Sequence, residues 1–226
     1  MAIQEAAVRQ IPMFAMLNGE ALSHVASMAI ERRYKRGEMI LLEGEHGGAL
    51  CYVSQGLVKV FKTSVEGREQ VLRLISAGNT FNDVPALDGG PNPASAAAME
   101  PSVIYLIRRA ELHQLIMSEP TVASAVIQTL AQALRHIVEL VEDLSLRHVT
   151  ARVAKLLLAQ ENEAKAEERG WSHHLTQQEM AAVVGTAREV VSRALKELEL
   201  AGAIEMHQGR AIILNREYLQ ILSGTD

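Results

Sequence analysis

Cysteine is almost absent from this sequence of 226 residues, since Cys51 is the sole example. One thiol cannot form a disulfide within the chain, and it cannot supply the several cysteine ligands of an iron–sulfur cluster. Long apolar runs are absent as well. No stretch approaches the roughly 20 uninterrupted apolar residues of a membrane span, and MAIQEAAVRQIPMF lacks the pattern of a signal peptide. We therefore expect a soluble protein of the cytoplasm with no membrane partner.

An excess of positive charge is also missing. The chain holds 22 Lys and Arg against 27 Asp and Glu, which gives a formal net charge of -5. A protein of this charge does not bind nucleic acid through its overall field. Any nucleic-acid site must therefore be a local patch.

The motifs of common enzymes are absent too. The sequence has no Ser/His/Asp grouping with recognisable spacing, no P-loop, no HExxH and no zinc-spaced cysteine pairs. We therefore expect neither an enzyme nor a metal site. An enzyme that uses its first region as a small-molecule site, or a pure scaffold, remains open as an alternative class.

The first region, residues 1–118, is punctuated by glycines at short intervals. A helix is predicted in NGEALSHVASMA, and another, AELHQLIMS, closes the region. Between them, short alternating or apolar runs predict strands in EMILLEG, LCYVSQG, LVKVFKT, QVLRLISAG and VIYLIRR, with SVEGREQ as a hairpin turn. Short strands separated by turns are typical of an antiparallel barrel or jelly roll.

The second region, residues 119–144, reads as one long helix. Pro120 suits a helix start, and neither Gly nor Pro interrupts the segment that follows. Apolar residues recur at steps of three and four, which is typical of a helix that pairs with a copy of itself. The alternative is a helix packed on its own domain. The predicted dimer seam comprises Val126, Leu130, Ala133, Ile137, Val141 and Leu144.

The third region, residues 145–226, has the order of a winged helix-turn-helix. LRHVTARVAKLLLAQ is amphipathic, and ENEAKAEERGW is expected to be a charged, flexible connection. Two short helices around Gly185 and a strand pair, AIEMHQG and RAIILN, follow. The whole chain is therefore expected to be an α+β protein: a jelly roll, a long dimerisation helix and a winged helix-turn-helix.

Both short helices have a start signal. Thr176 begins TQQE and Thr186 begins TARE, and each fits the capping box, in which a Thr hydroxyl and a Glu three residues later cap the helix reciprocally. Gly185 lies between the helices, where the turn needs an unhindered backbone.

The second of these helices exposes a polar face, which is open to two interpretations. It is an ordinary solvated face, or it enters the major groove of DNA, where Arg recognises guanine and Glu recognises cytosine. In the free protein we expect Glu189 to close the cap or to brace Arg193. The predicted DNA-binding residues are Thr176, Gln177, Thr186, Arg188, Glu189, Ser192, Arg193 and Lys196.

Three stretches carry a resemblance to the Crp/Fnr family of bacterial transcription regulators: GLVKVFKTSVEGREQVLRLISAGNTF, LSLRHVTARVAKLLL and LTQQEMAAVVGTAREVVSRALKELELAGAI. The resemblance implies a homodimer that works with RNA polymerase and whose first region is a sensor. It puts the DNA-reading positions on Arg188, Glu189, Ser192 and Arg193. It also implies a twofold-symmetric site with half-sites close to TTGA or TGTGA, and the pattern favours the Fnr-like form.

The resemblance also shows a departure. Cyclic-nucleotide binders of the family carry G-E-x-x-L and then R-S or R-T, and the matching stretch here is FNDVPALDGGPNPASA. Asp83 stands at the Glu position, Pro93 at the phosphate-binding Arg and Ala94 at the Ser. Because Pro has no cation or side-chain donor, we expect cyclic AMP to bind poorly. The predicted effector pocket comprises Leu72, Phe81, Asp83, Val84 and Leu134.

Other forms of control stay open. The barrel stretch resembles the branch of the family that senses nitric oxide through haem. Candidate haem ligands are His24, His46, His113 and Cys51, and each is also explained as an ordinary surface or buried residue. The protein could instead need no ligand and respond to its concentration or to oxidation of Cys51.

Overall fold

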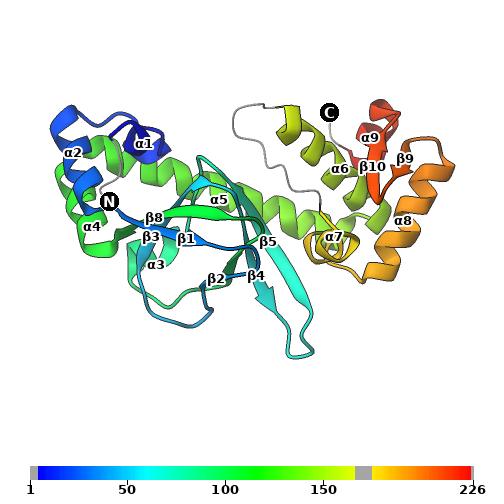
Figure 1. Ribbon diagram of the computed structural model, residues 1–226, viewed down its shortest axis with the longest axis horizontal. Helices are drawn as coiled ribbons and strands as arrows, with labels where there is room; N and C mark the ends of the chain where they lie inside the picture. Colours follow the sequence, from blue (N-terminus) through cyan, green and yellow to red (C-terminus); the bar gives the residue numbers. More distant parts are fainter. Residues whose placement is uncertain (1–4, 166–174, 225–226) are drawn as a thin grey trace. The chain divides into compact units, whose positions relative to one another are not determined.

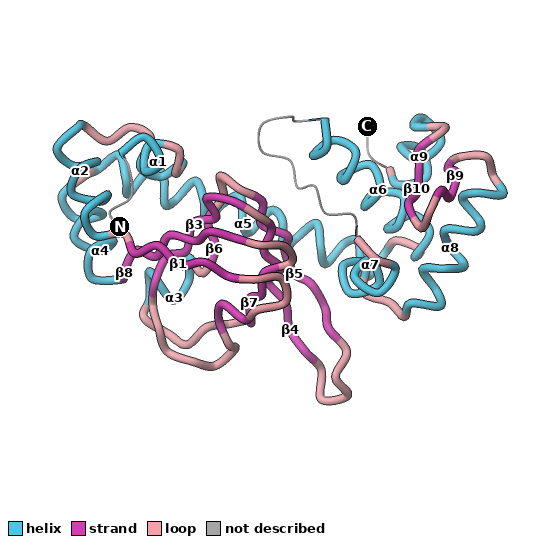
Figure 2. The backbone as a smooth tube through the Cα atoms, viewed as in Figure 1, coloured by secondary structure: helices cyan, strands magenta, loops and turns pink. Residues whose placement is uncertain are grey.

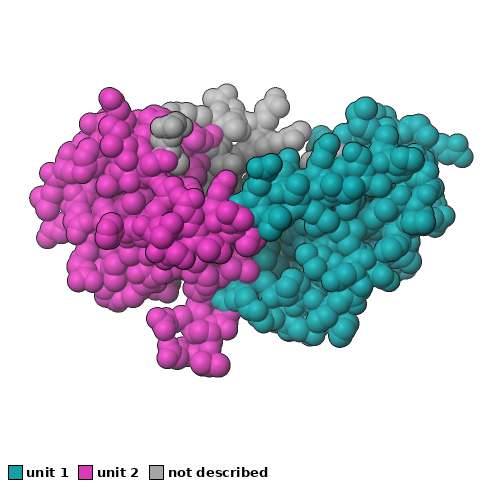
Figure 3. All heavy atoms as spheres, turned by 180° about the vertical axis from the view of Figure 1, so that it is seen from behind, with its two compact units in different colours: residues 1–62, 73–136 teal, residues 63–72, 137–226 magenta. Residues whose placement is uncertain are grey.

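The computed structural model describes residues 5–165 and 175–224. The chain forms two compact units, one of residues 1–62 and 73–136 and the other of residues 63–72 and 137–226 (Figure 3). The long helix α5, Pro120–Leu146, contributes to both units and divides after His136.

The first unit contains two four-stranded sheets, in the orders β1-β8-β3-β6 and β2-β7-β4-β5. Because strands that follow each other in the chain often lie in different sheets, the arrangement is a jelly roll. The predicted jelly roll is thus confirmed. The strands are β1 Ile30–Tyr34, β2 Met39–Leu41, β3 Ala49–Gln55, β4 Leu57–Thr63, β5 Glu69–Ser76, β6 Thr80–Phe81, β7 Ser95–Ala98 and β8 Ser102–Arg108.

Strand β3 has a core on each of its faces. Cys51 and Val53 lie in the cluster between the sheets, whereas Leu50 and Tyr52 lie in a second cluster beneath the helices. Successive side chains of a strand point to opposite faces, so burial on both faces requires a continuous apolar run. This explains why LCYV does not alternate with polar residues.

Helices cover the outer face of the β1-β8-β3-β6 sheet in the first unit (Figure 1). One of them, α3, was not predicted, since FNDVPALDGG has neither length nor period. Its Pro85 lies in the first turn, where a missing N–H breaks no helical bond. The helices are α1 Glu5–Arg9, the 3-10 turn η1 Pro12–Phe14, α2 Gly19–Met28, α3 Asp83–Asp88 and α4 Arg109–Ser118.

The second unit is a winged helix-turn-helix (Figure 2). The β9–β10 hairpin is the wing, and a final helix that was not predicted, α9, packs on α6. Among the described residues, no helix has the length and apolar character to cross a membrane. The elements are α6 Val149–Lys165, α7 Gln177–Val184, α8 Arg188–Leu200, β9 Ile204–His207, β10 Arg210–Ile213 and α9 Arg216–Ser223.

Helix α6 is longer than the sequence suggested. The segment ENEAKAEERGW was expected to be a flexible connection, but α6 continues to Lys165. Glu, Ala and Lys favour helices, and the side chain of Arg216 binds both Glu161 and Asn162, the latter at 2.8 Å from Nη2 to Oδ1. The expectation was therefore wrong for residues 161–165. The rest of the segment, 166–171, lies outside the described residues.

Candidate DNA-binding surface and effector pocket

Helix α7 begins at the predicted capping box. The Thr176 hydroxyl accepts a hydrogen bond from the Glu179 backbone N–H at 3.2 Å, and the Glu179 carboxylate accepts one from the Thr176 N–H at 2.7 Å. Two N–H groups that the helix leaves unsatisfied are thereby paired. The prediction for this helix start is confirmed.

The turn after α7 depends on Gly185. Its φ of 69° is in the left-handed region, and its N–H bonds the Ala181 carbonyl. A Cβ at this position would lie 2.5 Å from the Leu144 Cδ2 atom and 2.5 Å from the Gln70 Oε1 atom. The backbone conformation requires glycine, as the sequence suggested, and a Cβ would also displace the ends of these two side chains.

The predicted capping box at Thr186 is wrong. Helix α8 begins at Arg188, and its N-cap residue is Ala187, which has no side chain to bond the helix. The Thr186 N–H instead donates to the Ala181 carbonyl at 3.0 Å and so helps to end α7. The helix therefore starts one residue late, and Glu189 falls at its second position, not at the third that a capping box needs.

The exposed face of α8 is the predicted reading surface. Four apolar side chains at helical spacing are buried, Val191, Ala194, Leu195 and Leu198. On the opposite side, every predicted polar residue is exposed: Arg188, Glu189, Ser192, Arg193 and Lys196. Within the described part of the chain, none of their side chains forms a hydrogen bond or ion pair. The expected bond of Glu189 to the cap or to Arg193 is therefore not formed.

Contacts from neighbouring elements hold α8 in place. The Thr150 hydroxyl on α6 donates to the Glu197 carboxylate at 2.8 Å. The Glu199 carboxylate accepts from the Met206 N–H at 3.1 Å, which ties the wing to the same helix. Helix α6 and the wing thus both hold α8 in position. Of the remaining predicted residues, Thr176 is exposed, and Gln177 and Thr186 are half-buried.

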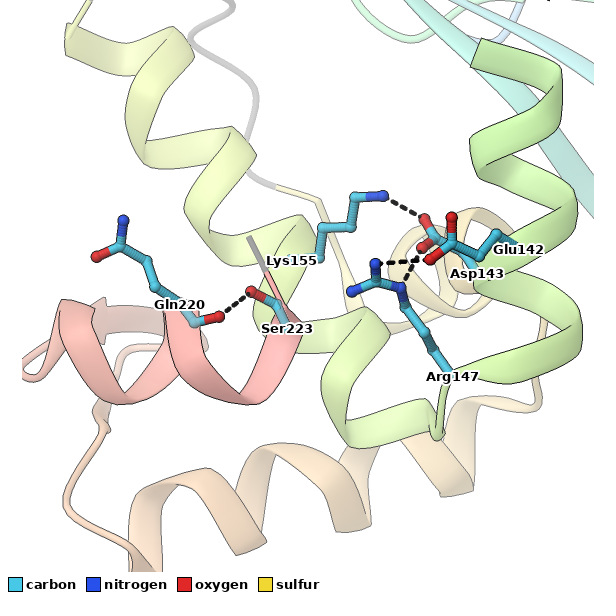
Figure 4. Close-up of polar contacts among 6 residues, drawn as sticks. All are labelled: Glu142, Asp143, Arg147, Lys155, Gln220 and Ser223. Carbon is cyan, nitrogen blue, oxygen red and sulfur yellow. Dashed lines mark hydrogen bonds and ion pairs between the residues drawn. The ribbon is translucent and has the colours of Figure 1, made fainter. Parts of the chain in front are cut away.

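An ion-pair cluster that we did not predict joins α5 to α6 (Figure 4). Asp143 binds the Arg147 Nε at 2.9 Å and the Lys155 Nζ at 2.6 Å, and Glu142 binds the Arg147 Nη2 at 3.0 Å. Burial lowers the pKa of the nearby Arg152, and the negative charge of Asp143 acts in the opposite direction, toward a higher pKa. The spacing of four residues between Asp143 and Arg147 was the signal that could have revealed one pair of this cluster.

An apolar stripe on α5 is exposed. Leu130, Ile137, Val141 and Leu144 from the predicted seam are between 37% and 57% exposed. In contrast, Val126 is 7% exposed and lies in the core of the first unit, and Ala133 is half-buried. The most exposed members of the stripe were not in the predicted seam: Ile127, Leu134 and Val138, at 67%, 64% and 60%.

The five predicted effector residues differ in exposure. Phe81 is buried between the sheets and Asp83 is buried near it, whereas Val84 and Leu134 are 49% and 64% exposed. Leu72 is half-buried on β5. A pocket of about 250 Å³ lies elsewhere in the first unit, between β5–β6 and α5. This Arg73 pocket is lined by Met13, Arg73, Leu74, Asn79, Thr80, Thr129, Gln132, Ala133 and His136.

Comparison with known proteins decides the family. Residues 31–119 match the cyclic nucleotide-binding domain, and residues 151–222 match the Crp-like helix-turn-helix domain. The chain is 33% identical over 198 residues to the cyclic AMP receptor protein of Thermus thermophilus, and the match spans 88% of this chain and 90% of that relative. The chain belongs to the Crp/Fnr family of transcription regulators.

Two further relatives agree with this assignment. A cAMP-activated global transcriptional regulator of Mycobacterium tuberculosis is 30% identical over 185 residues, which cover 80% of this chain and 82% of that protein. The structure of FixK2 from Bradyrhizobium japonicum matches with a TM-score of 0.74 at 25% identity, over 86% of this chain and 96% of that one. This Crp/Fnr protein is therefore a regulator with a DNA-binding helix-turn-helix and is not an enzyme.

Two asparagine side chains anchor the segment FNDVPALDGGPNPASA to neighbouring backbone carbonyls. Asn92 is 3% exposed, and its amide donates to the Leu42 carbonyl at 3.0 Å. Asn82 donates in the same way to the Ala49 carbonyl at 3.0 Å. Burial raises the pKa of Asp83. A hydrogen bond from Thr80 at 3.1 Å and the Arg73 guanidinium 3.9 Å away both act to lower it.

The four candidate haem ligands of this Crp/Fnr protein differ in environment. Cys51 is fully buried, and burial raises the pKa of its thiol. The His113 Nε2 lies 3.1 Å from the Leu87 carbonyl oxygen, and His24 and His46 are exposed. None of the four lines the Arg73 pocket. Within the described ranges, no group of three or more His, Cys, Asp and Glu side chains is arranged to hold a metal ion.

Proposed function

We propose that this protein is a homodimeric regulator that reads a twofold-symmetric DNA site through α8, with half-sites close to TTGA or TGTGA. The observation that carries the proposal is the state of the reading surface. Arg188, Glu189, Ser192 and Arg193 lie within the first two turns of α8, all exposed and none engaged by another described residue. The first turns of the second helix are the part that a helix-turn-helix places in the major groove.

The chemistry of these side chains suits base recognition. An Arg can donate two hydrogen bonds to the O6 and N7 of guanine, and a Glu can accept from the N4 of cytosine. Glu189 needs no rearrangement to do this, since no cap holds it. We assign Thr176, Gln177, Thr186 and Lys196 to the DNA backbone, because hydroxyl, amide and ammonium groups are common phosphate partners.

The stripe on α5 supports the dimer. Ile127, Leu130, Leu134, Ile137 and Val141 follow one another at steps of three and four, and 37% to 67% of each side chain is exposed in the single chain. Such a stripe is the seam of a two-stranded coiled coil. A dimer would bury it and present two reading heads to the two half-sites. A regulator of this kind acts in the cytoplasm together with RNA polymerase.

We further propose that cyclic AMP is not the effector. Relatives of this chain are named for cyclic AMP, but Pro93 and Ala94 remove the cation and the hydroxyl that the family uses for the phosphate. Calorimetry that finds micromolar or tighter binding of cyclic AMP would contradict this proposal. Control through haem is the alternative that predicts a Soret band in the purified protein, and ligand-independent control predicts none.

Binding of a palindromic duplex tests the DNA-reading assignment. We expect Arg188→Ala to weaken binding to the preferred site by about 1–3 kcal/mol and to relax discrimination at one base pair. The matched control is Arg33→Ala on β1, an exposed Arg of the first unit. Fluorescence anisotropy with matched and single-mismatch duplexes measures both effects, and equal affinity of Arg188→Ala and wild type would reject the assignment.

Replacement of Leu134 and Ile137 by Asp tests the dimer. Two carboxylates in an apolar seam lack partners, so we expect a monomer in sedimentation and a loss of binding to the two-half-site duplex. The matched control replaces Gln128 and Arg135, polar residues of the same helix, by Asp. A double variant that remains a dimer would show that the seam lies elsewhere.

A further inference from the structure

The guanidinium of Arg73 in this pocket has no hydrogen-bond partner within the described part of the first unit. Within the described residues, the sole partner of the Arg73 guanidinium is Asp83, whose Oδ2 lies 3.9 Å from Nη1. That distance is too long for a hydrogen bond. Arginine carries five N–H donors, and 30% of this side chain is exposed, so these donors are available to a molecule in the pocket.

The neutral polar groups around Arg73 are also incompletely used. The Gln132 amide has no hydrogen-bond partner in the described part of the chain. The Thr129 hydroxyl donates to the Ala125 carbonyl at 3.0 Å and keeps its acceptor capacity. The Asn79 amide donates to Ser76, which leaves its oxygen free to accept. The pocket thus offers one strong anion partner and several weaker hydrogen-bonding groups.

The charge around the pocket sets a limit on its ligand. Arg73 is the single Lys or Arg among the nine lining residues, and the buried carboxyl group of Asp83 lies beside it. A doubly charged phosphate would face one cation and a nearby acidic group. One negative charge, in contrast, is matched by one guanidinium, whose planar fork fits a carboxylate.

We propose that the Arg73 pocket binds a small organic acid, with its carboxylate on Arg73 and its apolar body against Met13, Leu74 and Ala133. The proposal rests on the proposed function, since it names the effector class of the sensor. A pocket of about 250 Å³ is smaller than the typical range of about 300–1,000 Å³ for ligand sites, which favours a compact acid. The ligand touches β5 and β6 on one side and Gln132 on α5 on the other, so it biases how these elements pack.

Titration calorimetry of the full-length protein tests this with four probes: isocaproate, its neutral amide isocaproamide, inorganic phosphate and cyclic AMP. We expect isocaproate to bind and the other three to bind at least tenfold more weakly. Because a hydrogen-bonded charged group typically contributes about 1.5–3 kcal/mol, Arg73→Gln should weaken isocaproate about ten- to hundredfold. The matched control Arg68→Gln, at the exposed hairpin turn, should leave the affinity unchanged.

A second variant distinguishes the loss of a ligand contact from a fold defect caused by the change at Arg73. Gln132→Leu, on the opposite wall, should weaken isocaproate several-fold while the circular dichroism spectrum stays that of wild type. Equal binding of isocaproate and isocaproamide, stronger binding of phosphate, or no binding of isocaproate would each overturn the proposal. Duplex binding by the same preparation shows whether the regulator itself is intact, so the two proposals fail separately.

Discussion

The starts of α7 and α8 share the pattern Thr-x-x-Glu but have different structures. Thr176 and Glu179 form both hydrogen bonds of a capping box, whereas Thr186 and Glu189 form neither. The difference arises from the preceding residue. Thr186 directly follows Gly185, the residue that ends α7, and its N–H bonds the Ala181 carbonyl, whereas Thr176 follows Leu175 and its N–H bonds the Glu179 carboxylate.

The N–H of Thr186 cannot close α7 and also complete a capping box for α8. A capping box needs an N-cap residue whose N–H faces the Glu side chain at the third helical position. At Thr186 that N–H already bonds Ala181, so the helix start moves to Ala187. The Glu189 carboxylate is therefore without a partner among the described residues, as the proposed reading of DNA requires, whereas the identical group of Glu179 is used for the fold.

The largest expected effect comes from removing the glycine that creates this difference. Gly185→Val places a branched side chain in the left-handed region, where the Cβ would lie 2.5 Å from Leu144. Conformational strain of about 1–2 kcal/mol and overpacking of about 1–3 kcal/mol should together cost about 3 kcal/mol. Urea unfolding of the second unit, followed by circular dichroism, measures the loss.

The control for that variant separates strain from crowding. Gly202 also has a positive φ, of 68°, but a Cβ there would meet no atom within 4 Å. Gly202→Val should therefore show the conformational cost alone. Equal losses for the two valine variants would mean that the contacts around Gly185 are not the cause.

Parts of this fold were predictable because their signals are local. The long helix α5 and strand β4 follow from apolar periodicity within a single segment. Helix α3 and the start of α8 were missed or misplaced because each depends on neighbours: Pro85 is tolerated by its place in the first turn, and Thr186 is recruited by α7. The exposure of the predicted effector residues was equally unpredictable, since Val84 and Leu134 are 49% and 64% exposed although both are apolar.

An intermediate effect is expected at the two glutamates, and it should appear in different assays. Glu189→Gln should leave the unfolding free energy unchanged within about 0.5 kcal/mol, as for other surface changes. It should cost about 1–3 kcal/mol of discrimination at one base pair, because the carboxylate no longer accepts from cytosine. Anisotropy titrations with four duplexes that differ at that pair measure the change.

The matched variant is Glu179→Gln, in which the same chemical change falls on the capping box. We expect it to lower stability modestly and to leave the preference among the four duplexes unaltered. If Glu189→Gln keeps the base preference of wild type, the carboxylate of α8 has no part in reading DNA.

The smallest expected effect is at the two threonines, and it measures directly which of them caps a helix. Thr176→Ala removes a hydroxyl that caps α7 and should destabilise the second unit by about 1 kcal/mol, the usual cost of losing an N-cap. Thr186→Ala removes a hydroxyl that caps nothing and should cost less than about 0.5 kcal/mol. Both losses of stability are calculated from the midpoints of urea unfolding, with the denaturant slope m unchanged. Similar losses would mean that Thr186 caps α8 in solution, and Glu189 would then be shared between the helix and DNA.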